Sequence, residues 1–262
     1  MVLERLISLK TAVRQPAWMF VIGGVVSTIC MLVAFFIFQT SVGLFTTILI
    51  TIAMTPFMVN LIRFEEAREE EVQGIEKMNL LQRHKDILKV YTAFFAGMIL
   101  SMSIIYIALP QMTVEKIFSD QISEINAIRG QIAFADTFQK IIINNTGVLF
   151  LSFVFSFLFG AGAVFILAWN ASVLAAAIGI AAKSIGGIGG LPVAILVFFP
   201  HGSLEILAYF IGAVAGGLVS TVVMRKKAKK FWFVIYDSLQ LMFVAAILLV
   251  VAAVVETVAI VV

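Results

Sequence analysis

Residues 15 to 62 contain no charged side chain, and this uncharged stretch is the strongest constraint on how the chain can fold. It is long enough for two membrane spans of about 20 residues each, with a turn that contains Gln39, Thr40, Ser41 and Gly43. Across the whole chain 62% of the residues are hydrophobic and 13% are charged, about half the charged fraction of soluble domains. Because a backbone in lipid must satisfy its own hydrogen bonds, these runs predict an all-α polytopic transmembrane helix bundle with about six or seven membrane segments.

We divide the chain into two regions within a single membrane domain overall. Residues 1–89 hold an amphipathic N-terminal helix, the hairpin of two spans, and a charged cytoplasmic linker over residues 63–89. Residues 90–262 form the rest of the bundle. In this second region the sequence predicts a span, an interfacial helix and three further spans, over residues 90–109, 111–140, 146–169, 204–224 and 238–255.

Before residue 204 the apolar sequence is cut into short pieces by glycine and proline. Residues 171–182 are too few to cross a bilayer comfortably, and the segment SIGGIGG joins them to a second short run over residues 191–199. This pattern is typical of broken or re-entrant helices, which need surrounding protein to satisfy their backbone. Whether residues 171–199 cross or re-enter the membrane stays open, and Asn170 is predicted to lie at the helix break, where it can cap the next helix.

The Lys and Arg residues indicate the orientation of the bundle. With the N-terminus in the cytoplasm, 14 of the 18 lie in segments on the inner side, as the positive-inside rule requires. The basic run RKKAKK at residues 225–230 then ends a span on the cytoplasmic side. We therefore expect a multi-pass protein of the cell membrane with a cytoplasmic N-terminus.

Glu205 is the only charged residue between Lys183 and Arg225, in a helix predicted to begin near Pro200. His201 lies one turn earlier on the same face, within reach of a hydrogen bond. Two interpretations stay open at this point. In the first, Glu205 reaches water at a membrane interface or makes a purely structural bond to His201. In the second, it marks a functional polar site, because ionisable groups at membrane depth are costly to retain.

Several other functions do not fit the residues. One histidine and one carboxylate are too few ligands for a zinc site, so we expect no metal and no cofactor. No nucleophile stands at a suitable spacing from them, and we expect that the chain is not an enzyme. The net charge is +3, and the basic cluster fits the flank of a membrane span, so we expect no nucleic-acid partner.

Two adjacent asparagines precede a glycine-rich span, another asparagine ends it, and an H-G-x-x-E helix rich in small residues follows. The residues are Asn144, Asn145, Gly160, Gly162, Asn170, His201, Gly202 and Glu205. This arrangement resembles the SpoIIM family, the stage II sporulation protein M group, over about residues 138–224. The first two spans and the linker are more similar to the longer archaeal-type members. We take Asn144, Asn145, Asn170, His201 and Glu205 as a candidate intramembrane polar site, with the asparagines added on the basis of the resemblance.

The resemblance also sets the expected function. In sporulating bacteria it implies a scaffold that holds peptidoglycan-degrading enzymes at the membrane. We therefore expect an integral membrane scaffold or assembly component, whose partners are the lipid bilayer and other membrane or envelope proteins. Small residues from Ala208 to Gly217 favour close helix packing, and we expect a homo-oligomer, with a dimer favoured. The alternative is a transporter or channel for an ion or small solute that uses the polar site around Glu205.

Overall fold

The computed structural model describes residues 7–71, 80–129, 134–159, 163–225 and 231–261. Within these ranges the regular structure is helical, without strands. The shorter helices are α2 (Leu9–Arg14), α5 (Leu80–Arg83), α7 (Gln111–Ile117), α8 (Ser119–Arg129) and the 3₁₀ helix η2 (Gly187–Gly190). The longer helices are α3 (Ala17–Ile37), α4 (Val42–Glu71), α6 (Lys85–Ala108), α9 (Phe134–Phe159), α10 (Val164–Ile185), α11 (Leu191–Arg225) and α12 (Phe231–Val261).

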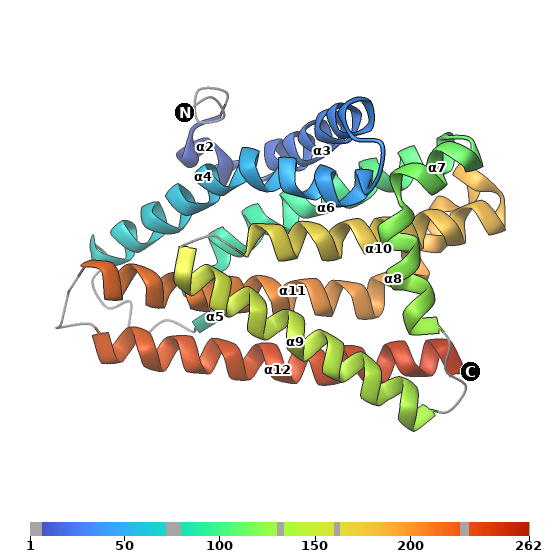
Figure 1. Ribbon diagram of the computed structural model, residues 1–262. Coiled ribbons are helices and arrows are strands. Elements are labelled where there is room, and N and C mark those ends of the chain that lie inside the picture. The colour runs from blue at the N-terminus through green and yellow to red at the C-terminus, as the bar shows by residue number, and fades with distance from the viewer. Residues whose placement is uncertain (1–6, 72–79, 130–133, 160–162, 226–230, 262) are drawn as a thin grey trace.

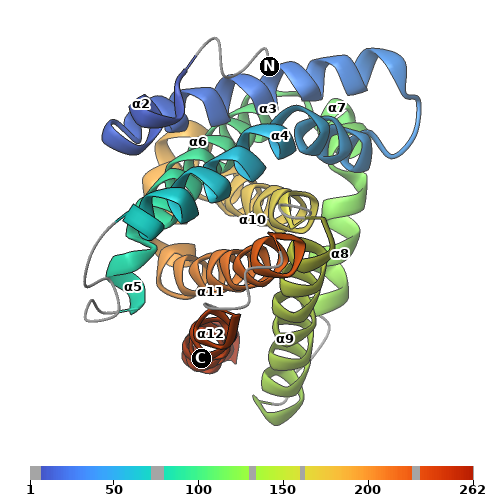
Figure 2. The same cartoon turned by 90° about the vertical axis from the view of Figure 1, so that its left-hand side faces the viewer.

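All seven of the longer helices contain a segment that is long and apolar enough to cross a membrane. Helices α3 and α4 lie on one side of the bundle, and α9 and α12 lie on the other (Figures 1 and 2). Helices α6, α10 and α11 lie between them and have the most buried side chains. The chain is therefore a multi-pass membrane protein, and the prediction of an all-α polytopic bundle is confirmed.

Aromatic side chains join the two halves of the core. Tyr91 and Phe95 of α6 are buried against Phe210 of α11, with ring centroids 5.6 and 5.2 Å from that of Phe210. Aromatic pairs at these distances add about 0.5–1.5 kcal/mol to what burial alone supplies. The centre of the bundle is thus held by contacts between a helix before the glycine-rich region and one after it.

Helices α3 and α6 approach each other closely at two glycines. A Cβ atom at Gly23 would collide with the carbonyl oxygen of Phe94, and one at Gly97 with the carbonyl oxygen of Phe20. One turn away, the hydroxyls of Ser27 and Ser101 lie 2.8 Å apart. Small residues and hydroxyl pairs of this kind hold membrane helices together in lipid, where helices gain little from the hydrophobic effect.

The small-residue face of α11 packs inside the same chain. A Cβ at Gly212 would meet the side chain of Leu149, and one at Gly216 the carbonyl oxygen of Phe153, both on α9. The segment from Ala208 to Gly217, which was predicted to form a dimer contact, is therefore covered by α9. A homo-oligomer stays a prediction, but it cannot use this surface.

The boundaries of α10 and α11 differ from those expected. Among the described residues, the membrane spans contain no short re-entrant helix. Helix α10 runs unbroken through Asn170, and residues 171–182 are its second half rather than a separate segment. Helix α11 begins at Leu191 and contains Pro200 in its interior. Proline removes one backbone donor, but this is tolerated in a membrane helix whose neighbours and local adjustments satisfy the freed carbonyl. The turn between the two helices lies at Gly186 and Gly187, whose φ angles are 132° and 70°.

An ion pair joins the end of α5 to α12 at the end of the bundle where α11 ends (Figure 1). The guanidinium of Arg83 donates to the carboxylate of Asp237, and both side chains are more than nine-tenths buried. The same guanidinium lies 5.3 Å from the ring centroid of Phe233. Residues 72–79 of the predicted linker and the residues of RKKAKK after Arg225 lie outside the described residues, as do residues 1–6 of the predicted N-terminal helix.

Candidate functional site

A cavity of about 500 Å³ opens between α9, α10 and α11, with further walls from α8 and α12. Helix α9 crosses the bundle obliquely, so that it diverges from α10 (Figures 1 and 2). The walls are mostly apolar, and the polar groups gather on α9 and α11. All five residues of the predicted polar site line this one cavity, and Glu256 of α12 joins them: Asn144, Asn145, Asn170, His201, Glu205 and Glu256.

The centre of the site is a pair of carboxyl groups. The side-chain amide of Asn145 donates a hydrogen bond of 2.8 Å to Oε1 of Glu205. The carboxyl group of Glu256 lies next to that of Glu205 in the same cavity. Asn145 is 5% exposed, whereas Glu205 and Glu256 are only partly buried and are reached from the cavity. Three helices, α9, α11 and α12, thus each contribute one side chain to a single polar cluster.

Glu205 lies in the interior of α11, fourteen residues after the helix begins at Leu191. Gly202 faces the side chain of Leu174, nine residues before Lys183, which corresponds to roughly 13 Å along α10. Lys183 in turn donates to the carbonyl oxygen of Leu109, where α6 ends. Glu205 is about one turn further along α11 than Gly202, and Glu256 beside it lies five residues before the end of α12 at Val261, so both interpretations of Glu205 stay predictions.

His201 and Asn170 line the cavity without contacting Glu205 through a hydrogen bond. Nδ1 of His201 is buried and has no hydrogen-bond partner within the described residues, and its ring lies 5.7 Å from that of Phe198. The amide of Asn170 donates back to the carbonyl oxygen of Ile166 in its own helix, at 2.8 Å. The hydrogen bond that the sequence assigned to His201 is therefore made by Asn145. His201 retains a free ring nitrogen beside the cavity.

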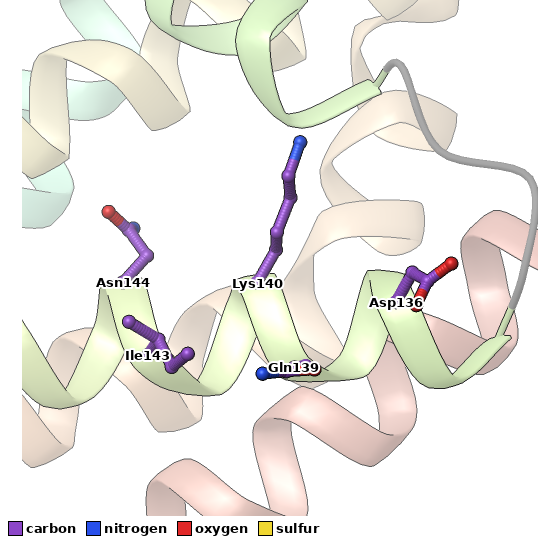
Figure 3. Close-up of a pocket in the computed structure, with 5 residues that line it drawn as sticks. All are labelled: Asp136, Gln139, Lys140, Ile143 and Asn144. Carbon is purple, nitrogen blue, oxygen red and sulfur yellow. The ribbon is translucent and has the colours of Figure 1, made fainter.

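Lys140 and Asn144 belong to an exposed face of α9 beside this cluster. Their side chains point to the same side of the helix, away from Gln139 and Ile143 (Figure 3). The amide of Asn144 donates to Oδ1 of Asn145 at 3.3 Å, which orients the residue that holds Glu205. Lys140 lines both the main cavity and a shallower hollow of about 380 Å³ on α9. This face forms the rim of the site.

The sequence alone did not identify Glu256 as part of the site. The last span was expected to end at Val255, which would leave Glu256 beyond it, whereas α12 continues to Val261. The signal that could have found it is a single carboxylate after a long uncharged run, the same signal that singled out Glu205. Gly160 and Gly162, which carried part of the resemblance, lie outside the described residues.

Comparison with known proteins gives one match. The family model described as Stage II sporulation protein M, SpoIIM, matches residues 87–259, which begins near the start of α6 and includes every residue of the polar cluster. No curated protein and no solved structure matches the chain. Since the match covers well over half of the sequence, the chain belongs to the SpoIIM family.

Proposed function

We propose that this SpoIIM-family protein transports an ion or a small solute across the membrane, and that it binds this solute in the cavity around Glu205. The observation that supports the proposal most is the contact between the carboxyl groups of Glu205 and Glu256 inside the bundle. A carboxyl group at membrane depth is destabilising unless it is paired or hydrated, and such groups often mark ion or substrate pathways. Two of them beside an accessible cavity make a binding role the simplest explanation.

The surroundings of the pair also favour binding over a purely structural role. A structural cluster would gain most by satisfying all of its buried polar atoms. Here Nδ1 of His201 has no hydrogen-bond partner among the described residues, and Glu205 and Glu256 remain partly exposed to the cavity. These groups are available to a solute that enters between α9 and α10.

The test is a measurement of current in reconstituted proteoliposomes on a solid-supported membrane. Concentration jumps of Na⁺, K⁺ and benzyltrimethylammonium should give a transient current with at least one of these probes. The variants Glu205→Gln and Glu256→Gln should fold and lose the current, whereas Glu115→Gln, which changes an exposed carboxylate that accepts a hydrogen bond from Gln111, should retain it. Equal currents in wild type and both cavity variants would refute the proposal.

The second candidate is the scaffold or assembly role, which membership of the SpoIIM family supports. In that case the outward apolar face of α12, where Phe243 is 69% exposed, contacts another membrane or envelope protein in place of lipid. A photo-crosslinking amino acid at Phe243 should then capture one specific protein in cells, and replacement of Glu205 should leave that product unchanged. A crosslink only to lipid at this position would remove the main support for the scaffold role.

A further inference from the structure

We propose that the cavity takes an organic ammonium cation, and that this cation displaces a proton shared between Glu205 and Glu256. The inference rests on the proposed transport function and names the class of its solute. Three observations support it: the two carboxyl groups that lie together in the cavity, the charges that face them, and the size and aromatic lining of the cavity.

The closeness of the two carboxyl groups limits how many protons the pair can lose. Ionised carboxylates accept hydrogen bonds and cannot donate them. Two ionised carboxylates side by side would repel each other and could not bond to each other, so the pair of Glu205 and Glu256 is most stable with one proton between the two groups. In this state the pair carries a single negative charge, and loss of the proton makes it doubly negative. The amide of Asn145 remains a donor to Glu205 in either state.

The other titratable groups around the cavity do not neutralise the pair. Helix α8 contributes Glu124, and α9 contributes Lys140, which is exposed on the rim. Helix α11 contributes His201 and Tyr209 besides Glu205 itself, and α12 contributes Glu256, while the residues of α10 that line the cavity are uncharged. The cations in the described part of this site are thus confined to Lys140 and, when it is protonated, His201. Carboxyl groups predominate, which favours a positively charged solute.

The cavity is too large and too apolar for a bare metal ion. Metal ions such as Na⁺ or Mg²⁺ need several oxygen ligands at close range, whereas this space of about 500 Å³ is enclosed mostly by hydrocarbon. That volume lies within the usual range of small-molecule sites, roughly 300–1,000 Å³. Four aromatic rings, Phe165, Trp169, Phe198 and Tyr209, line it. Aromatic rings and carboxylates together are the groups that bind substituted ammonium ions.

The exchange balances in charge and in atoms. When the cation enters, the O–H bond in the carboxyl pair breaks, its electron pair stays on the oxygen, and the proton leaves to water. The pair changes from one negative charge to two, and the cation adds one positive charge. The net charge of the occupied site therefore equals that of the protonated empty site, so the exchange adds no further charge to the interior of the bundle. One proton leaves for each cation that binds, so a gradient of either can move the other.

The experiment is a binding titration of the full-length protein in lipid nanodiscs with benzyltrimethylammonium. Isothermal calorimetry in buffers of different ionisation enthalpy gives both Kd and the number of protons released. We expect up to one proton released per cation, and a Kd that falls by up to about tenfold per unit rise in pH over part of the range from about pH 5 to 9. The neutral isostere neopentylbenzene should bind far more weakly, and Na⁺ and K⁺ should not compete.

Two variants separate the proton exchange from a general loss of folding. Glu256→Gln removes the shared proton while it keeps a hydrogen-bonding side chain beside Glu205, so binding should persist without proton release and with a nearly flat pH dependence. Glu256→Asp should restore part of the pH dependence, and the exposed Glu115→Gln should match the wild type. A pH-independent Kd in the wild type, or equal affinity for neopentylbenzene, would overturn the inference.

The outcomes also distinguish this inference from the transport function itself. Currents with Na⁺ or K⁺, without binding of benzyltrimethylammonium, would leave transport standing and refute the organic cation. Binding of benzyltrimethylammonium with proton release, without current for any probe, would support the site and refute transport.

Discussion

The ion pair between Arg83 and Asp237 allows the sharpest prediction of stability. Arg83 lies just before the region that matches the family, and Asp237 lies within it. Their side chains are 8% and 7% exposed. Replacement of Asp237 by Asn leaves the guanidinium buried without its carboxylate, and breaking a buried pair in this way typically costs about 3–5 kcal/mol. Because the ring of Phe233 stays 5.3 Å from the guanidinium, we expect the lower end, about 3 kcal/mol.

The assay is equilibrium unfolding in mixed micelles, followed by circular dichroism as the fraction of dodecyl sulfate rises. A loss of about 3 kcal/mol corresponds to roughly a hundredfold change in the unfolding equilibrium. Glu115→Gln is the matched control, since its partner Gln111 lies 3.0 Å away on an exposed surface, and surface changes usually stay within about 0.5 kcal/mol. The double variant Arg83→Met with Asp237→Leu should recover most of the loss, because apolar side chains often replace a buried pair without cost.

A change of less than about 0.5 kcal/mol in Asp237→Asn would refute this reasoning. It would mean that water reaches the pair, and that the end of α5 is not fixed to α12 by charge.

The remaining predictions concern packing, the polar cluster and topology. Gly216→Leu should strongly destabilise the bundle, because the new side chain would meet the carbonyl oxygen of Phe153. Gly147→Leu should be tolerated, because a Cβ atom at that position meets nothing within 4 Å. The same unfolding assay compares the two variants. Asn145→Ala should cost about 1–3 kcal/mol by removing the donor to Glu205, and Asn144→Ala, on an exposed side chain, should cost less in that assay. In a Cys30→Ser background, a cysteine at Ser119 should react with an impermeant maleimide from outside the cell and one at Gln82 should not; the reverse pattern would invert the proposed orientation.

The bundle itself could be predicted because lipid imposes a simple rule on composition. The uncharged stretch before Arg63 had to form membrane helices, and the structure places α3 and most of α4 there. The boundaries around Asn170 and Pro200 could not be predicted in the same way. Capping and proline signals describe helices whose ends meet water. Inside a membrane bundle there is no water to satisfy the backbone at such an interruption, so both helices continue through these residues.

The candidate site could be predicted only in part, for a related reason. Glu205 and His201 are one turn apart, and their shared face follows from helical geometry. The adjacent asparagines came from the resemblance to a family, and nothing in their own spacing connects them with Glu205. Glu256 reaches the cluster only because α12 packs along α11, and a contact between distant segments leaves no local pattern. The hydrogen bond expected from His201 is made by Asn145 for the same reason.

The most direct test of the central claim is whether Glu205 and Glu256 can be reached by a solute within the membrane. Dicyclohexylcarbodiimide is an apolar reagent that reacts with protonated carboxyl groups to leave a stable N-acylurea, which mass spectrometry of digested nanodisc samples can locate. We expect an adduct on Glu205 or Glu256 and protection of that residue by benzyltrimethylammonium. No adduct on either residue, or an adduct whose yield no cation reduces, would contradict it.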